Sequence, residues 1–205
     1  MPNGANDGRA DTIQTRRMSV ATISTFLGLL ALATFLGVLG TLVLAVMDRI
    51  RLVPGAVAGL RGALRPAALW LAFLVALTAM SGSLYFSEGA GFVPCALCWY
   101  QRIAMYPLVV ILFVAALRDD PGVVRYAGPV AAIGALLSIW HIGVQRLPAL
   151  PSGSCSLDAP CSAIYIEVIG FITIPTMALA GFWAIITLLL LRASGESEPE
   201  LESPE

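Results

Sequence analysis

The stretch PAALWLAFLVALTAMSGSLYFS, residues 66–87, carries no charged side chain and is bounded by Arg65 and Glu88. A helix of about 20 apolar residues, each rising about 1.5 Å, crosses the roughly 30 Å hydrocarbon layer of a bilayer. This stretch is long enough to cross it and has too few polar residues for the surface of a water-soluble helix. It therefore predicts a transmembrane helix over residues 66–87.

Four further stretches have the same character, and each holds at most one charged side chain. They cover residues 18–47, 98–117, 126–146 and 166–191. A sequence with five such segments predicts an all-α integral membrane protein with five transmembrane helices.

The composition agrees with a membrane protein. Hydrophobic residues make up 58% of the 205 residues and charged residues 12%, against roughly 25% charged in a typical globular protein. All twelve basic residues are arginine, and thirteen acids bring the formal net charge to −1, so no broad basic face is present for nucleic acid. The composition excludes a soluble enzyme domain and a nucleic-acid-binding protein.

The first apolar segment has two readings, because Arg16 and Arg17 precede it as they would a secretory signal. The segment 18–47 far exceeds the roughly 7–15 apolar residues of a signal core, and no clear small-residue cleavage site follows it. We therefore expect a retained transmembrane helix there. Residues 1–17 and 192–205 read as a polar and an acidic tail, and neither is expected to pack.

The arginines predict the orientation of the helices, since short loops rich in arginine stay in the cytoplasm. Seven arginines mark one side of the membrane, most of them in the connection 48–65: Arg49, Arg51, Arg61, Arg65, Arg118, Arg125 and Arg192. The alternate loops, 88–97 and 147–163, contain no arginine; they hold Cys95, Cys155 and Cys161, and Cys98 directly follows the first loop. Both cysteine pairs are therefore expected outside the cytoplasm, although Arg9, Arg16 and Arg17 count against this orientation for the first helix.

The four cysteines form two close pairs, Cys95/Cys98 and Cys155/Cys161. Such a set makes either two disulfides or one four-sulfur zinc site. An extracytoplasmic loop is an oxidising place, where unprotected thiols become disulfides. We therefore rank redox chemistry first and a structural four-cysteine zinc site second. A small transporter is a third reading, but it would need polar groups deep in several spans.

The first pair lies in PCALCWYQRI, residues 94–103. The proline is expected in the first turn of a helix, where its missing N–H costs nothing, and two cysteines three apart then share a face. The pKa of a cysteine falls near a helix N-terminus and near arginine. Arg102 lies one turn beyond Cys98 and is expected to stabilise its thiolate and an anionic electron acceptor; the alternative is an arginine that reaches toward the lipid headgroups.

The second pair lies in CSLDAPC, residues 155–161, within a loop rich in proline and glycine. We expect this pair to be exposed and mobile. An exposed disulfide in a small ring is open to attack by a partner thiolate, which suits exchange with a soluble protein. The alternative is a disulfide that merely staples the loop.

At these residues the chain resembles the disulfide bond formation protein B (DsbB) family, most closely its BdbC branch. The resemblance rests on PCALCWYQRI with MYP at 105–107, and on the later run with Cys161, Ser162, Glu167 and GFITIP at 170–175. It covers about residues 66–191, with both cysteine pairs in the family's order. The segments 1–17, 18–47 and 48–65 depart from the family pattern.

The resemblance implies a four-helix transmembrane bundle, here with one additional N-terminal transmembrane helix, in the inner membrane of a bacterium. It implies that Cys155/Cys161 takes electrons from a DsbA-like thioredoxin-fold oxidase, that Cys95/Cys98 is reduced in turn, and that Cys98 passes the electrons to ubiquinone or menaquinone beside Arg102. A relay of this kind, ending on a quinone, keeps the bacterial periplasm oxidising. No resident metal is expected. His141, the only histidine, is a further candidate for contact with the quinone.

Overall fold

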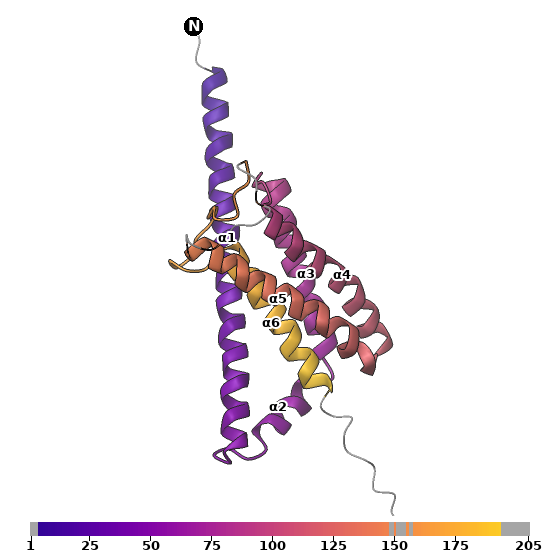
Figure 1. Ribbon diagram of the computed structural model, residues 1–205. Coiled ribbons are helices and arrows are strands. Elements are labelled where there is room, and N and C mark those ends of the chain that lie inside the picture. Colours follow the sequence, from indigo (N-terminus) through magenta and orange to yellow (C-terminus); the bar gives the residue numbers. More distant parts are fainter. Residues whose placement is uncertain (1–3, 148–149, 151–154, 156–157, 194–205) are drawn as a thin grey trace, which may run out of the picture.

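The computed structural model describes residues 4–147, 150, 155 and 158–193. The described chain is almost entirely helical (Figure 1): α1 (Gly4–Arg49), α2 (Ala56–Leu64), α3 (Ala68–Leu84), α4 (Ala96–Arg118), α5 (Val124–Arg146) and α6 (Ile174–Ala193). A π-helical turn, Tyr85–Gly89, extends α3, and a 3₁₀ turn, Pro121–Val123, precedes α5. Within the described residues there is no strand, only an isolated bridge between Val168 and Ile172.

Five of the helical segments are long and apolar enough to cross a membrane. They are Met18–Arg49, Ala68–Gly89, Ala96–Arg118, Pro121–Arg146 and Ile174–Ala193. The prediction of an all-α, multi-pass membrane protein is therefore confirmed. Short α2 lies in the arginine-rich connection between the first two spans.

Two boundaries differ from the sequence prediction. The helix α1 begins at Gly4, whereas a polar tail was expected over residues 1–17. The helix extends into this segment because adding residues to a nucleated helix costs little free energy. The last span begins at Ile174 and not at 166. Ile169 and Gly170 have positive φ angles of 54° and 75°, which no α-helix contains, and the bridge at Val168 turns the chain there. Of the expected acidic tail, residues 194–205 lie outside the described residues.

The core lies between α3, α4, α5 and α6, the four-helix bundle that the resemblance implied. Leu108, Leu112, Phe182 and Ile185 have no exposed surface there. Many large apolar side chains point outward instead, for example Ile103, Val110, Leu136 and Leu190. A water-soluble protein would bury such residues, whereas in a membrane they face the lipid tails.

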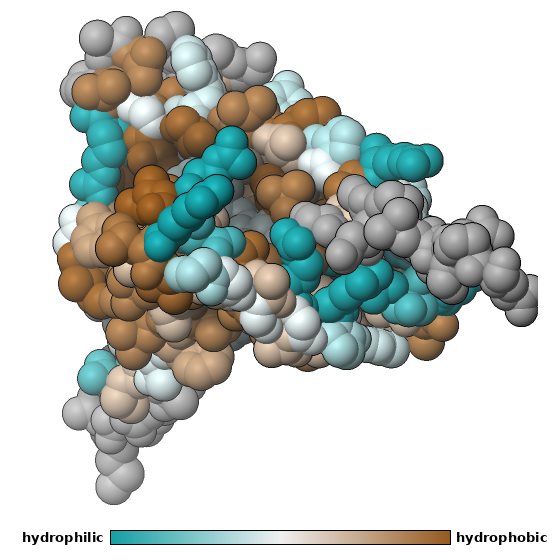
Figure 2. All heavy atoms as spheres, turned by 90° about the horizontal axis from the view of Figure 1, so that it is seen from below, coloured by the Kyte–Doolittle hydropathy of each residue, from teal (hydrophilic) through white to brown (hydrophobic). Residues whose placement is uncertain are grey.

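The two ends of the bundle differ in their side chains. At one end Arg192 of α6 donates hydrogen bonds to the Asp119 carboxylate at 2.7 Å and, more weakly, to the Arg65 carbonyl at 3.5 Å. Seen from this end, which is the lower end in Figure 1, hydrophilic side chains stand among hydrophobic ones (Figure 2). Both cysteine pairs lie at the opposite end, where α4 begins and α5 ends.

The packing of α5 on α6 depends on Gly134. A Cβ at this position would lie 2.2 Å from two ring carbons of the fully buried Phe182. We expect Gly134→Ala to lower the free energy of unfolding by about 1–3 kcal/mol through overpacking. Thermal unfolding in detergent measures this. Gly128→Ala on the same helix, whose Cβ would meet its nearest neighbour at 3.9 Å, is the control, and equal unfolding temperatures for both variants would contradict the packing.

Candidate functional site at the cysteine-bearing end

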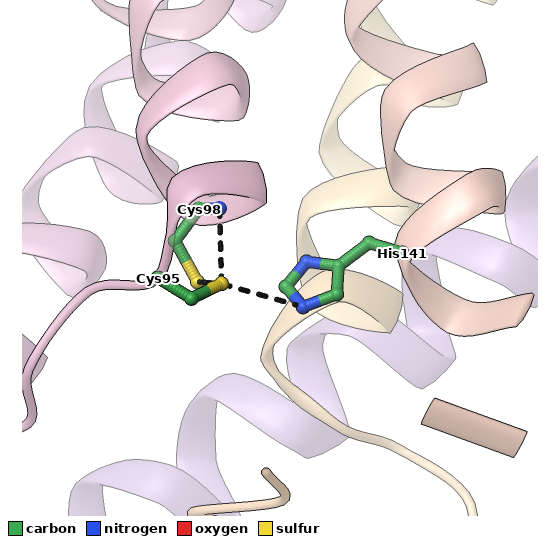
Figure 3. A group of neighbouring side chains, drawn as sticks. All are labelled: Cys95, Cys98 and His141. Atoms are coloured by element: carbon green, nitrogen blue, oxygen red, sulfur yellow. Dashed lines mark hydrogen bonds between the residues drawn. The ribbon is translucent and has the colours of Figure 1, made fainter. Parts of the chain in front are cut away.

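Cys95 caps the N-terminus of α4. Its backbone is extended, with φ −74° and ψ 172°, and its Sγ accepts a hydrogen bond from the backbone N–H of Cys98 at 3.3 Å. The sulfurs of Cys95 and Cys98 are free thiols that lie 3.0 Å apart (Figure 3). Pro94 precedes the cap and so lies just before the first helical turn and not within it, where it was expected. The local fold thus brings both sulfurs within reach of a disulfide bond.

Cys155 and Cys161 are joined in a disulfide, with Cα atoms 5.7 Å apart. Cys161 is only 1% exposed, and Cys155 is half-buried. The expectation of an exposed pair is therefore wrong for Cys161. Its sulfur packs in a cysteine cluster formed by Cys95, Leu97, Val144, Ala159 and Cys161, so apolar packing from α4 and α5 outweighs the polar character of the loop. Much of that loop lies outside the described residues.

His141 of α5 lies between the two pairs. Its Nε2 is 3.1 Å from the carbonyl oxygen of Cys161 and 3.6 Å from the Sγ of Cys95 (Figure 3). A carbonyl oxygen only accepts, so Nε2 carries the hydrogen and donates. The side chain is 1% exposed, and its Nδ1 has no hydrogen-bond partner among the described residues. The imidazole therefore ties the second pair to the first.

The surroundings of Cys95 favour its thiolate. The hydrogen bond from the Cys98 thiol is the largest influence that holds the pKa of Cys95 below its ordinary value, and the bonds from His141 and from the Cys98 backbone act in the same direction. Burial opposes them, because it disfavours the charged form. Cys95 is thus both a reactive thiol and a stable leaving group for disulfide exchange.

Arg102 lies one turn along α4 from Cys98, but its hydrogen bonds go elsewhere. Its Nε donates to the Ser83 hydroxyl and its Nη2 to the Ser83 carbonyl, each at 2.9 Å. The guanidinium also lies over the ring of Trp99, 5.2 Å from the centroid. Arg102 therefore bonds to Ser83 of α3 and not to Cys98. These bonds fix the guanidinium, whose positive charge acts on the space beside Cys98.

A cavity of about 330 Å³ opens at Cys98 and Arg102. Helices α1, α3, α4 and α6 form its walls, which are mostly apolar. Cys98, Gln101 and Arg102 are among its lining residues, and Cys95 and His141 are not. His141, the further candidate for contact with a quinone, does not line this cavity. The volume lies within the usual range for small-molecule sites, ~300–1,000 Å³.

Sequence reasoning missed two polar residues of this cavity. Ser83 holds Arg102, and its only sequence signal is a serine in the outer part of an apolar span. Gln101 is 5% exposed, and its Nε2 has no hydrogen-bond partner among the described residues. A buried amide in this state marks a place where a ligand or water completes the bonding.

The four-cysteine zinc site of the second reading is not formed. The disulfide consumes the sulfurs of Cys155 and Cys161, and a cysteine binds zinc only as a thiolate. Cys95, Cys98 and His141 offer three ligand atoms within 4.8 Å of one another, which is the ligand set of an open site and not of a closed structural one. The pairing of one dithiol with one disulfide instead favours redox exchange.

Together these features define a multi-pass helical membrane protein with a dithiol and a disulfide packed at one end. The family model for disulfide bond formation protein DsbB matches residues 65–192. The chain belongs to the DsbB family and is a membrane disulfide bond formation protein, as the cysteine motifs predicted. Helices α1 and α2 lie outside the matched region.

Curated relatives agree with this assignment. Disulfide bond formation protein C of Bacillus subtilis is 50% identical over 132 residues, which is 63% of this chain and 95% of that protein. Probable disulfide formation protein C 2 of Bacillus cereus is 42% identical over 128 residues, 62% of this chain and 92% of that protein. A probable disulfide formation protein C of Halalkalibacterium halodurans is 46% identical over 123 residues, 58% of this chain and 90% of that protein. No solved structure matches the chain.

The lowered pKa of Cys95 predicts a shifted pH dependence of alkylation. In the reduced protein, Cys95 should react with iodoacetamide at half its maximal rate at a pH below about 8.5, the ordinary thiol value, because its thiolate persists to lower pH. Cys98→Ala removes the hydrogen bond that lowers the pKa of Cys95 most, and His141→Phe removes another. Both variants should move this midpoint to higher pH. Mass spectrometry of the Cys95 peptide measures the rate.

The matched control is Trp140→Phe, which introduces the same side chain next to His141 on α5 at a half-exposed position. Its midpoint should equal that of the unaltered protein. A midpoint that is the same in His141→Phe and Trp140→Phe would remove the histidine from this role.

Proposed function

We propose that the protein is a thiol:quinone oxidoreductase that reoxidises an extracytoplasmic, DsbA-like thiol oxidase and passes the electrons to a membrane quinone. The observation that carries the proposal is the position of the first pair between two environments. Cys95 packs against Cys161 in the cysteine cluster, and Cys98 lines the apolar cavity. The first turn of α4 thus connects the Cys155/Cys161 pair, which would meet the partner protein, with a cavity for a lipophilic acceptor.

The cavity suits a quinone. It is mostly apolar, and two hydrogen-bond donors lie beside a thiol: the Arg102 guanidinium and the Gln101 amide, whose Nε2 has no hydrogen-bond partner in the part of the chain that the structure describes. When bound, a quinone supplies a two-electron, two-proton acceptor. Arg102 and Gln101 can donate hydrogen bonds to its ring oxygens, and the fixed positive charge of Arg102 favours the reduced form. Ubiquinone and menaquinone both carry these ring oxygens, so either fits the same donors.

The first step is exchange with the partner protein at Cys155. A partner thiolate must reach a sulfur along the disulfide axis, and Cys155 is half-buried whereas Cys161 is 1% exposed. Attack on Cys155 forms a mixed disulfide and releases Cys161 as a thiolate. The second thiol of the partner then closes the partner's own disulfide and frees Cys155, so two electrons and two protons enter the pair.

The second step transfers the electrons between the two pairs. The released Cys161 lies in the same cluster as Cys95, so its thiolate attacks the Cys95 sulfur of an oxidised Cys95–Cys98 bridge, and Cys98 leaves. Cys155 then displaces Cys95 and restores the Cys155–Cys161 disulfide. His141 donates its Nε2 hydrogen to the Cys161 carbonyl and to the Cys95 sulfur, which holds the two sulfurs in register and stabilises Cys95 as it leaves.

The observed redox states correspond to the point after this exchange, with Cys155–Cys161 oxidised and Cys95 and Cys98 as thiols. In the third step Cys98 delivers the electrons into the cavity while Cys95 closes the bridge. The dithiol then loses two electrons and two protons, and the acceptor gains both. The cycle consumes one partner dithiol and one quinone.

The proposal also assigns sides to the membrane. One end of the bundle carries Arg61 of α2, Arg118 and Arg192, and the other end carries the cysteines. By the positive-inside tendency the arginine-bearing end faces the cytoplasm. Both pairs then face the oxidising side of a bacterial cell membrane, where the partner is found.

The partner should be trapped on Cys155 and not on Cys161. We expect the Cys161→Ala variant to form a mixed disulfide with a DsbA-like oxidase that retains only its attacking cysteine and is supplied as its thionitrobenzoate disulfide, from which thionitrobenzoate leaves as the thiolate. Cys155→Ala should form at least about tenfold less, because its remaining sulfur is buried. Non-reducing gels measure the product. Both variants should be alkylated equally once unfolded in denaturant, and equal trapping of the two folded variants would contradict the proposed order.

Quinone reduction tests the function directly. A variant with Cys155→Ala and Cys161→Ala retains only the first pair. Reduced and mixed with a ubiquinone analogue without oxygen, it should form one quinol per chain as the Cys95–Cys98 bridge closes. Ultraviolet absorbance measures the quinol, and resistance to alkylation measures the bridge. Adding Cys98→Ser should abolish quinol formation, and turnover without Cys98, or bridge closure without quinol, would overturn the proposal.

A further inference from the structure

Helix α1 lies outside the part of the chain that matches the family, yet it forms one wall of the cavity. Leu27, Leu30, Ala31 and Thr34 line it, and they recur at intervals of three or four residues. This spacing places them on one face of the helix. The hydroxyl of Thr34 already donates to the Leu30 carbonyl at 2.8 Å, so the wall offers only apolar surface to a ligand.

The cavity has the shape of a slot. Its lining on α3 and the turn after it runs from Leu71 to Ser87, again at intervals of three or four residues. At 1.5 Å per residue this face is about 24 Å long, most of the roughly 30 Å hydrocarbon layer. The linings on the other three helices are shorter, from Leu27 to Thr34, Cys98 to Tyr106 and Ile174 to Phe182, so all four helices wall the cavity of about 330 Å³ over about 12 Å and α3 lines it further. A linear hydrocarbon chain can follow this extension along α3.

Close contacts seat α1 over the gap between α3 and α6. The side chain of Leu27 lies where a Cβ on Gly82 of α3 would be 2.9 Å away. Ala31 packs in a buried cluster with Ala180 of α6 and Ile172, and Phe35 meets Trp183 of α6 edge to face at 5.7 Å. The wall is therefore a packed part of the bundle and not a loosely attached anchor.

We propose that α1 completes the acceptor site by binding the hydrocarbon tail of the quinone along Leu27, Leu30, Ala31 and Thr34. The inference rests on the proposed function, since the occupant is the tail of the molecule whose ring lies beside Cys98 and Arg102. From the level of these two residues the slot continues along α3 as far as Leu71, and the tail of a ring bound beside them can follow this path. In this chain a helix outside the family region thus sets the selectivity for the tail of the acceptor.

The test fills the slot from α1 and compares two acceptors. Thr34→Trp should raise the KM for a decyl-substituted benzoquinone about tenfold, because the added ring displaces several buried methylene groups of the tail. The KM for the same ring with no tail should stay within twofold of the unaltered protein. Ala33→Trp, at the adjacent exposed position, should change neither value.

A second variant guards against misfolding. Leu30→Ala removes wall surface without adding bulk and should raise the KM for the decyl quinone several-fold, again with the tail-free quinone unaffected. Thermal unfolding temperatures and the rate of exchange with the reduced partner should match the unaltered protein in all three variants. If Thr34→Trp and Leu30→Ala behave as Ala33→Trp does, or change both quinones alike, α1 does not bind the tail. If the unaltered protein reduces neither quinone, the proposed function itself fails.

Discussion

The last two turns of α5 fasten the segment 161–173 onto the bundle, and the geometry of the site depends on this attachment. His141 donates to the Cys161 carbonyl, Gln145 donates to the Ala163 carbonyl at 3.2 Å, and Arg146 pairs with Glu167 at 2.7 Å. The first two lie one turn apart on one helical face, and Gln145 also accepts from Thr173 at 2.9 Å. His141 is buried and Gln145 is half-buried, so losing their acceptors would cost the desolvation of a polar group. The pair of Arg146 with Glu167 is exposed and contributes less. The segment is thereby held where its disulfide meets Cys95.

The N-terminus of α4 places its two sulfurs in two different surroundings, the cysteine cluster and the cavity. Cys95 is the cap and Cys98 follows three residues later, which brings the sulfurs to within 3.0 Å of each other. The cap faces the cysteine cluster, and the following thiol borders the cavity. In the proposed function, a soluble partner and a quinone therefore do not share a site. The exchange between them is reduced to opening and closing one local disulfide.

The sequence predicted the spans well, because the length of an uncharged stretch is a property of the chain itself and a bilayer imposes a fixed thickness. The prediction failed at the start of α6. The residues around Ile169 are as apolar as those of the helix, and only their backbone angles keep them out of it. The cysteine motifs identified the family, but the burial of Cys161 and the separation of His141 from the cavity depend on which helices pack together. The contact of Ser83 with Arg102 joins two helices and leaves no trace in local spacing.

That contact also explains how a cation is tolerated within an apolar span. An unpaired charge inside a bilayer is costly, and such residues persist where partners compensate them. Both hydrogen bonds from Arg102 end on Ser83, and the guanidinium face lies on Trp99. These partners are neutral, so they fix the guanidinium without cancelling its charge. A carboxylate in place of Ser83 would neutralise the positive charge beside Cys98. A hydroxyl and a carbonyl leave that charge directed at the cavity, where in the proposed function a reduced quinone would carry negative charge.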